Sequence, residues 1–253
     1  MKIAVITGVS RGLGESIAKL FLQTKIQVIG ISRSENEHLF TYAEKSGTNF
    51  FHYTCDLSNR EAIQETFQKI FTERLSKEKP STVYLINNAG VVGPITQAMH
   101  MNHEELAYHV QVNTIAPMMW MNSFLQKATE HGFELIGVNI TSGAGSRPVY
   151  GWSAYCSTKA SINIYTETVA LEQDERQTGH KVIAFSPGIM DTDMQGEIRE
   201  STYDEFIEID TFKNYKKQNK LRHPDEVAKV LYHILLDEDH LENGKIYRLY
   251  DYV

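Results

Sequence analysis

The chain has 253 residues, 42% hydrophobic and 23% charged, which is enough apolar material for a buried core and excludes a disordered polyelectrolyte. Its formal net charge of −7 argues against binding of nucleic acid or of an anionic membrane surface. Cys55 and Cys156 lack any disulfide or metal-ligand pattern, and no apolar run is long enough for a membrane span or a signal peptide. We therefore expect a globular, cytoplasmic protein.

Short β-branched runs alternate with segments of helical period along the first part of the chain. Strand followed by helix, repeated, is typical of a parallel sheet with helices on both faces. Strands are expected at residues 2–7, 27–31, 49–54 and 82–86, and helices at residues 13–24, 37–46 and 60–76.

The alternation of strands and helices continues in the second part of the chain. A helical stretch over residues 104–130 is expected to break near Pro117, because proline cannot donate a helix hydrogen bond. Residues 189–222 become acidic, with interleaved aromatic residues and methionines, which predicts a lid over the strand ends. Without linker or repeat, the chain is expected to be a single α/β domain with a Rossmann-type, doubly wound parallel sheet of about seven strands. Further strands are expected at residues 134–141, 181–185 and 245–249, and helices at residues 154–178 and 224–236.

A glycine-rich segment, residues 7–14 (TGVSRGLG), joins the first strand directly to a helix. Residues without a Cβ allow a tight turn, and the helix N-terminus offers free N–H groups and a positive dipole end to a pyrophosphate. The spacing Gly-x-x-x-Gly-x-Gly differs from the usual dinucleotide fingerprint, so a turn that merely packs helix on strand remains the alternative. The loop residues expected to bind a dinucleotide are Gly8, Ser10, Arg11, Gly12, Leu13 and Gly14.

The second strand ends in Ser32-Arg33, with no carboxylate at its tip. A carboxylate there would bind the ribose hydroxyls of NAD, whereas an arginine accommodates the 2′-phosphate of NADP. Arg11 and Arg33 can converge on such a phosphate. Seven Lys and Arg against five acids also make the first 60 residues locally basic. NADP(H) is the expected cofactor, although Glu35 is near enough in sequence to leave NAD open.

Polar side chains follow two later strands and one helix. Tyr155 and Lys159 lie four residues apart, and hence on one face of an expected helix. Ser142 follows the strand predicted to end at residue 141, and an Asn-Asn-Ala-Gly segment, residues 87–90, follows the strand before it. Open parallel sheets bind ligands at the carboxyl ends of their strands, so these side chains are expected to gather there.

In this order and spacing, the motifs resemble those of the classical short-chain dehydrogenases/reductases over nearly the whole chain. The resemblance implies that residues 1–90 are mainly the cofactor-binding half and residues 91–253 the catalytic and substrate half. It also implies that Asp56 borders the adenine and that Thr192 reaches the nicotinamide end. The residues that the resemblance adds to the cofactor site are Asp56, Leu57, Asn88, Ala89, Gly90, Tyr155, Lys159, Pro187, Gly188, Ile189 and Thr192.

The resemblance makes Ser142, Tyr155, Lys159 and Asn113 the catalytic residues of a carbonyl reductase. A carbonyl that accepts a hydride needs a proton, and Tyr155 is the expected donor. The pKa of a free phenol is about 10, so Lys159 and the positive nicotinamide are expected to lower it. Ser142 would orient the carbonyl oxygen. Asn113 is implied to hold a water that links Lys159 to solvent.

Within the family, the chain is most similar to the bacterial sepiapterin-reductase-like group, which includes benzil reductases that form (S)-benzoin. The similarity lies in the TGVSRG opening, the length and the ending GKIYRLYD. Sepiapterin reductases carry an acid near this end, but Arg248 stands at the expected position and disfavours a pterin. An aromatic 1,2-diketone is therefore the expected substrate, with sepiapterin reduction or a catalytically silent NADP-binding regulator as the alternatives. The expected pocket wall is Ser142, Gly143, Ala144, Tyr150, Trp152, Ile189, Met190 and Met194, with Phe206 on the lid.

Two further features concern metals and partners. His100 and His103 have no second group of ligands nearby in sequence, so no metal is expected. Residues 117–121 (PMMWM) are apolar nearly all round, which predicts deep burial or a subunit interface. The resemblance implies a homodimer or a homotetramer.

Overall fold

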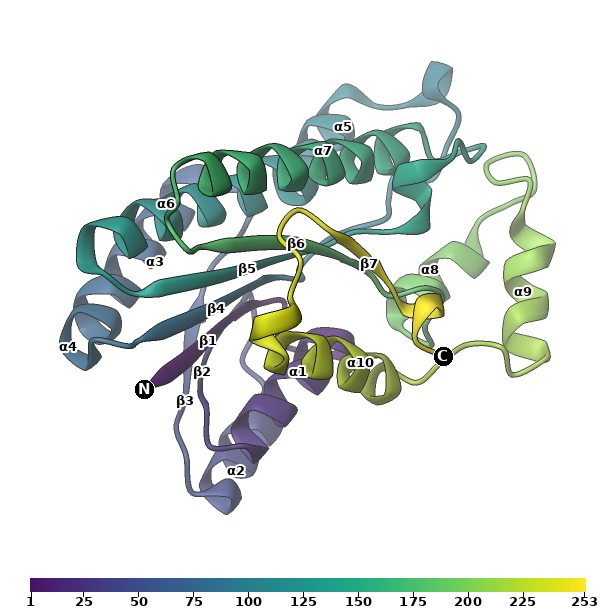
Figure 1. Ribbon diagram of the computed structural model, residues 1–253. Coiled ribbons are helices and arrows are strands. Elements are labelled where there is room, and N and C mark those ends of the chain that lie inside the picture. Colours follow the sequence, from purple (N-terminus) through teal and green to yellow (C-terminus); the bar gives the residue numbers. More distant parts are fainter.

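The computed structural model describes residues 1–253 and contains one sheet in which every strand pairing is parallel. Its strands are β1 (Lys2–Thr7), β2 (Gln27–Ser32), β3 (Phe50–Thr54), β4 (Thr82–Asn87), β5 (Glu134–Ile140), β6 (Lys181–Ser186) and β7 (Ile246–Arg248). Their order is β3-β2-β1-β4-β5-β6-β7 (Figure 1). The order reverses between β1 and β4, and ligands of open α/β sheets bind at such a switch point. This sheet confirms the predicted doubly wound α/β fold.

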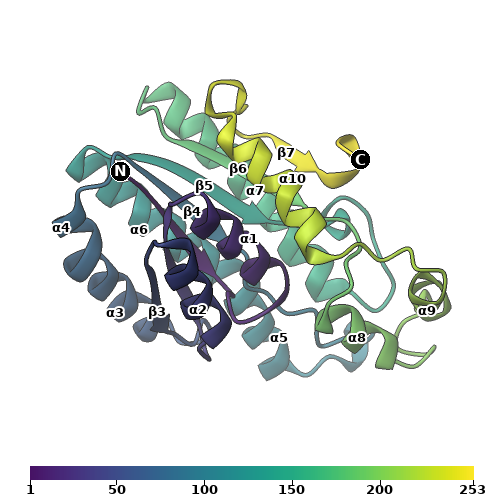
Figure 2. The same cartoon turned by 90° about the horizontal axis from the view of Figure 1, so that it is seen from below.

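Helices cover both faces of the sheet, and two helices lie beyond the carboxyl ends of its strands (Figures 1 and 2). The helices are α1 (Gly12–Gln23), α2 (Glu37–Ser46), α3 (Arg60–Ile70), α4 (Ser76–Glu78), α5 (His103–Val110), α6 (Ala116–His131), α7 (Ser153–Glu175), α8 (Asp193–Glu200), α9 (Ile209–Lys217) and α10 (Pro224–Leu236). No helix is both long and apolar enough to cross a membrane.

Each face of the sheet has its own hydrophobic core. The helices α1, α2 and α10 enclose 27 buried residues, and α3, α6 and α7 enclose 21 on the opposite face. The division follows the two-residue period of a strand, because Ala4 and Ile6 of β1 belong to the first core and Ile3 and Val5 to the second. Strands buried on both faces need continuous apolar runs, which is the pattern that predicted them.

The helix break predicted near Pro117 lies earlier in the chain. α5 ends at Val110, and residues Gln111–Ile115 form a π-helical turn before α6 begins. Pro117 has no N–H to donate to the carbonyl of Asn113, four residues before it, and its ring crowds that carbonyl. The wider π turn accommodates this conflict upstream of the proline. Asn113 therefore lies in an irregular turn rather than in a regular helix.

The lid, residues 189–222, contains α8 and α9 beyond the ends of the strands (Figure 1). Its buried apolar side chains belong to a third, smaller hydrophobic cluster. Phe206 is fully buried and stacks on Trp152 with 4.8 Å between the ring centroids. Phe212 meets both rings edge to face, at 5.5 Å from Trp152 and 5.2 Å from Phe206. The lid is thus attached to the body by packed aromatic side chains.

Candidate active site

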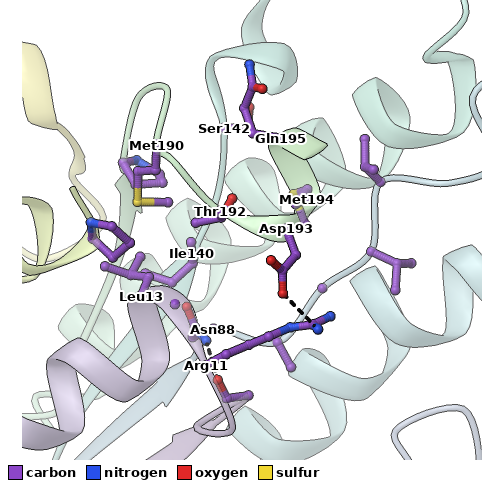
Figure 3. Close-up of a pocket in the computed structure, with 18 of the residues that line it drawn as sticks. Arg11, Leu13, Asn88, Ile140, Ser142, Met190, Thr192, Asp193, Met194 and Gln195 are labelled. Carbon is purple, nitrogen blue, oxygen red and sulfur yellow. Dashed lines mark hydrogen bonds and ion pairs between the residues drawn. The ribbon is translucent and has the colours of Figure 1, made fainter. Parts of the chain in front are cut away.

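A cavity of about 1140 Å³ opens where the loops after the strands converge (Figure 3). It lies at the switch point of the sheet, since residues that follow β1 and β4 both line it. The predicted site residues that line it are Gly8, Ser10, Arg11, Gly12, Leu13, Arg33, Asp56, Leu57, Asn88, Ala89, Gly90, Ser142, Gly143, Ala144, Trp152, Tyr155, Lys159, Pro187, Gly188, Ile189, Met190, Thr192 and Met194.

Four predicted residues lie elsewhere. Gly14 packs beneath the glycine loop and Asn113 lies behind the cavity wall, so neither lines the cavity. Tyr150 is 41% exposed and lies outside the cavity, because its neighbour Val149 takes the buried position in the lid cluster. Phe206 is buried in that cluster beneath the wall rather than in it.

The glycine loop is held against the end of β4 by hydrogen bonds from an asparagine side chain to the loop carbonyls. The side-chain amide of Asn88 donates to the carbonyls of Thr7, at 3.0 Å, and Gly8, at 3.2 Å. A Cβ on Gly14 would overlap the carbonyl of Gly8, and one on Gly8 would stand 2.9 Å from the Asn88 amide. The N-cap residue of α1, Arg11, makes no side-chain capping bond. The first N–H groups of α1 thus face the cavity mouth without a protein side chain, as a pyrophosphate site requires.

The charged side chains near the ends of β1 and β2 differ in their contacts. Arg33 is exposed and lines the cavity. Arg11 forms an ion pair with Asp193 of the lid at 2.8 Å, drawn as a dashed line in Figure 3. The carboxylate of Glu35 lies 3.8 Å from Nδ1 of His52 and does not line the cavity. An arginine rather than an acid therefore borders the cavity after β2.

Tyr155 and Lys159 of α7 are both buried in the floor of the cavity. The Lys159 ammonium donates to the carbonyl of Ile140 at 2.8 Å and lies 5.7 Å from the centroid of the Tyr155 ring. Ser142, which follows β5, accepts a hydrogen bond from the backbone N–H of Ala144 at 3.2 Å. The i, i+4 spacing on one helix thus brings the phenol and the ammonium together beside this serine.

Burial controls the protonation of these groups. It raises the pKa of the Tyr155 phenol to about 12, although a hydrogen bond with Ser142 opposes the shift. It lowers the pKa of the Lys159 ammonium to about 8. The sequence predicts that Lys159 and the nicotinamide lower the pKa of Tyr155, but in the protein alone burial raises it and Lys159 does not contribute to the shift. The phenol therefore keeps its proton at neutral pH, which is the form that can protonate an alkoxide.

The side chain of Asn113 is fully engaged with backbone and with one histidine. Its Oδ1 accepts from the N–H of Val91 at 2.9 Å, and its Nδ2 donates to the carbonyl of Val91 at 2.7 Å and to Nε2 of His109 at 2.9 Å. A Cβ on Gly90 would stand 3.1 Å from Oδ1 of Asn113 and 3.8 Å from Nζ of Lys159. Asn113 thus holds the segment after β4 close to Lys159.

Several side chains in and behind the cavity wall were not predicted from the sequence. His109 lies behind the wall against Asn113, and it could have been found from its i, i+4 spacing to that residue on a predicted helix. Tyr108 of α5 lines the cavity, as do Arg147 from a loop and several residues of the lid. Those of the lid include Gln195, Ile198, Phe212 and Tyr215.

The cavity at the switch point has the size of a dinucleotide, and a glycine loop at a helix N-terminus borders it. With Ser142 beside the buried Tyr155 and Lys159, these features define a class of oxidoreductases that act on CH–OH and C=O groups. The family model described as short chain dehydrogenase matches residues 2–202. The chain belongs to the short-chain dehydrogenase/reductase family. Family membership supports a nicotinamide cofactor.

Two bacterial relatives match this chain over its full length. It is 36% identical to a benzil reductase ((S)-benzoin forming) of Bacillus cereus, covering 98% of this chain and 99% of the relative. It is also 36% identical to a benzil reductase ((S)-benzoin forming) of Bacillus subtilis, covering all of both chains. Among solved structures, the short chain dehydrogenase/reductase YIR035C of Saccharomyces cerevisiae superposes with a TM-score of 0.82, at 26% identity over 98% of this chain and 96% of that one. These likenesses support a carbonyl reductase.

Proposed function

We propose that the protein uses NADPH to reduce one carbonyl of an aromatic 1,2-diketone, such as benzil, to the (S)-hydroxyketone. The observation that carries this proposal is the composition of the cavity wall beside Ser142 and Tyr155. A wall of flat rings and flexible thioethers suits a planar, hydrophobic carbonyl compound better than a sugar. The residues of this wall are Ala144, Trp152, Met190, Met194, Ile198, Phe212 and Tyr215.

The preference for NADPH over NADH rests on the charges after β2. Arg33 borders the cavity and forms no ion pair with an acidic side chain. The carboxylate of Glu35 lies beside His52 instead. Arg33, with the adjacent Ser34, is suited to bind a 2′-phosphate by charge-assisted hydrogen bonds. Arg11 can join them when its exposed ion pair with Asp193 opens, since such pairs stabilise by less than about 1 kcal/mol.

The protein's own side chains would supply the proton and stabilise the charge that its transfer leaves. A bound nicotinamide supplies the hydride. Ser142 donates a hydrogen bond to the carbonyl oxygen and orients it, and the protonated Tyr155 delivers its proton as negative charge develops there. Lys159, charged below its pKa of about 8, stabilises the resulting phenolate. The pH dependence of kcat/KM reports the pKa values of groups in the free enzyme. We therefore expect kcat/KM for reduction to fall above about pH 8, where Lys159 loses its charge.

An assay of NADPH oxidation with benzil, other aromatic diketones and sepiapterin, repeated with NADH, tests the proposal. We expect turnover of benzil to (S)-benzoin and a higher kcat/KM with NADPH. Turnover of sepiapterin without any aromatic diketone would overturn the substrate class, and equal use of NADH would overturn the role given to Arg33. Absence of all turnover would favour the alternative of a silent dinucleotide-binding regulator.

The role of Tyr155 can be separated from cofactor binding. Tyr155→Phe removes the proton donor, so kcat should fall by about 10²- to 10⁴-fold. Binding of NADPH, followed by its fluorescence, should be retained. Tyr203→Phe, on an exposed tyrosine of the lid, is the matched control and should keep full activity. Substantial activity in Tyr155→Phe would contradict the mechanism.

We also propose a homo-oligomer. Ile164 and Leu171, seven residues apart on α7, are 63% and 60% exposed and form an apolar stripe on the outer face of that helix. A second copy covering the stripe would explain these exposed side chains. Sedimentation velocity should show a dimer or tetramer, and a monomer at micromolar concentration would overturn this assembly. Residence in the cytoplasm and the division into a cofactor half and a substrate half remain predictions.

A further inference from the structure

His109 is a buried titratable residue that the reaction described above does not use. It lies in the last turn of α5, is 0% exposed, and faces the catalytic helix α7. Its ring meets that of Tyr155 nearly at right angles, with 6.1 Å between centroids. A histidine in such a place costs free energy unless its nitrogens are paired, and both of them are.

The contacts of His109 determine where its proton lies. Nδ1 is 2.6 Å from the carbonyl oxygen of Gly93, which can only accept, so Nδ1 carries the hydrogen. In the neutral ring Nε2 is then an acceptor, and it lies 2.9 Å from the Nδ2 amide of Asn113. The hydroxyl of Thr158, 3.2 Å from Nε2, also donates to the carbonyl of Tyr155 at 3.0 Å. Asn113 donates one of its two amide hydrogens to the carbonyl of Val91, so the other is donated to Nε2 of His109.

We propose that neutral His109 is a positioning residue for the reaction, holding Asn113 and the segment 91–93 in the arrangement that sets Lys159 beside Tyr155. The inference rests on the proposed reductase activity but not on the identity of the carbonyl substrate. His109 touches neither cofactor nor substrate, since it does not line the cavity. It acts through Asn113, whose Oδ1 and the ammonium of Lys159 both lie within 4 Å of the position that a Cβ on Gly90 would take.

The contact with Gly93 also links this network to the lid. Glu197 of α8 approaches Gly93 so closely that a Cβ there would stand 2.8 Å from its carboxylate. Burial raises the pKa of Glu197, and a hydrogen bond from the Gly93 backbone opposes this shift. One residue, Gly93, therefore lies between the lid carboxylate and His109. A movement of Gly93 would reach Asn113 through two hydrogen bonds, from Gly93 to His109 and from His109 to Asn113.

The arrangement requires an uncharged imidazole. Burial lowers the pKa of His109, the hydrogen bond to Gly93 opposes this, and the charge of Lys159 on α7 lowers it further. The other ionisable groups around it are the Tyr155 phenol on α7 and, across Gly93, Glu197 on α8. When acid protonates Nε2, its new hydrogen meets the amide hydrogen of Asn113 and the bond is lost. The kcat of reduction should therefore have an acid limb that belongs to His109.

Two isosteric substitutions separate the two bonds of His109. His109→Gln places an amide oxygen where Nε2 accepts from Asn113, and His109→Asn keeps an N–H for Gly93 but leaves Asn113 without its acceptor. For any carbonyl that the wild type reduces, we expect kcat to fall on the order of tenfold or more in His109→Asn, with KM for NADPH nearly unchanged. His109→Gln should keep kcat within about threefold of wild type and lose the acid limb of the pH profile.

Loss of kcat to the same extent in both variants, or an acid limb that persists in His109→Gln, would overturn the positioning role. The imidazole tautomer is a second measurement that needs no turnover. The ¹⁵N shifts of His109 in the free protein should report hydrogen on Nδ1 at neutral pH, and hydrogen on Nε2 would also overturn the inference. If the wild type reduces no carbonyl compound while the tautomer is as expected, the proposed function fails and the geometry of the network stands.

Discussion

The glycine loop and the lid both line the cavity and meet at the ion pair of Arg11 and Asp193, but they are held by different interactions. The loop, residues 7–14, is fixed by hydrogen bonds from the Asn88 side chain and by the close approach of Gly14 to Gly8, which leaves no space for one more carbon. The lid, residues 189–222, is fixed by buried rings, chiefly Phe206 on Trp152. The loop should therefore be sensitive to atoms that are added, and the lid to atoms that are removed.

The two regions also differ in charge. The first 60 residues carry a net charge of +2, whereas eight acids lie between residues 191 and 210 of the lid. Arg11 and Asp193 are the point where the basic loop meets the acidic lid. The overall charge of −7 thus disfavours a nucleic-acid polymer while leaving a basic region for a single dinucleotide. Substitutions at four positions test this contrast, in order of decreasing effect.

Phe206→Ala removes the central ring of the lid cluster. Because the ring is 0% exposed and its neighbours cannot collapse fully into the gap, the free energy of unfolding should fall by about 3–5 kcal/mol. Urea unfolding measures the loss. Ile207→Ala, on the next residue, which is 46% exposed, is the control and should cost far less. Equal effects of the two substitutions would mean that the lid is not held by its aromatic core.

Gly14→Ala adds one methyl group to the loop. Alanine favours a helix, but here its Cβ would overlap the carbonyl of Gly8, so the free energy of unfolding should fall by about 1–3 kcal/mol. NADPH binding should weaken in parallel, because the loop has to move. Gly196→Ala makes the same change in the lid helix α8, where the nearest atom is 3.9 Å away, and should stabilise by about 0.5–1 kcal/mol. A stabilised Gly14→Ala variant would break the contrast.

His52, on β3, should make the protein sensitive to acid. Burial lowers its pKa below the ordinary 6.5, with Glu35 opposing, so the unfolded chain takes up a proton at a higher pH than the folded one. The free energy of unfolding should fall as the pH drops below 6.5, by no more than about 1.4 kcal/mol per pH unit from this residue. Urea unfolding at pH 7.5 and at about pH 5.5 should show a smaller difference in His52→Gln. The exposed control His38→Gln should leave that difference unchanged.

Asp193→Asn breaks the ion pair that joins the two regions. Arg11 and Asp193 are 72% and 69% exposed, so the loss of stability should stay below about 1 kcal/mol. Because Arg11 is released for a 2′-phosphate, the Kd for NADPH should fall slightly while that for NADH does not. Isothermal titration with both cofactors checks this, and weaker NADPH binding would show that the pair supports the site instead.

The strands and most helices were predictable because burial on both faces leaves continuous apolar runs in the sequence. The helix break lies a few residues before the position predicted for it. Pro117 is the residue without an N–H, but the irregular turn forms around the carbonyl of Asn113, four residues earlier. The lid helices α8 and α9 were not predicted as helices, because each is short and buries only two residues, Gln195 and Ile198 in α8 and Ile209 and Phe212 in α9. Tyr150 was assigned to the cavity wall from its aromatic ring alone, and the turn of the chain exposes it instead.

The sequence by itself determined the fold and the positions of the proposed reacting residues. Alternation of strand and helix specifies a parallel sheet, and Ser142, Tyr155 and Lys159 are placed by strand ends and by the helical repeat, which are local properties. Only the tertiary structure decided which side chains form hydrogen bonds or ion pairs with one another. Packing orients the ring of His109 so that it bonds to Asn113 and Gly93. Packing also brings Arg11 and Asp193, which are far apart in the sequence, together as an ion pair. The pKa of Tyr155 was likewise decided by burial, a property of the folded interior that no local pattern encodes.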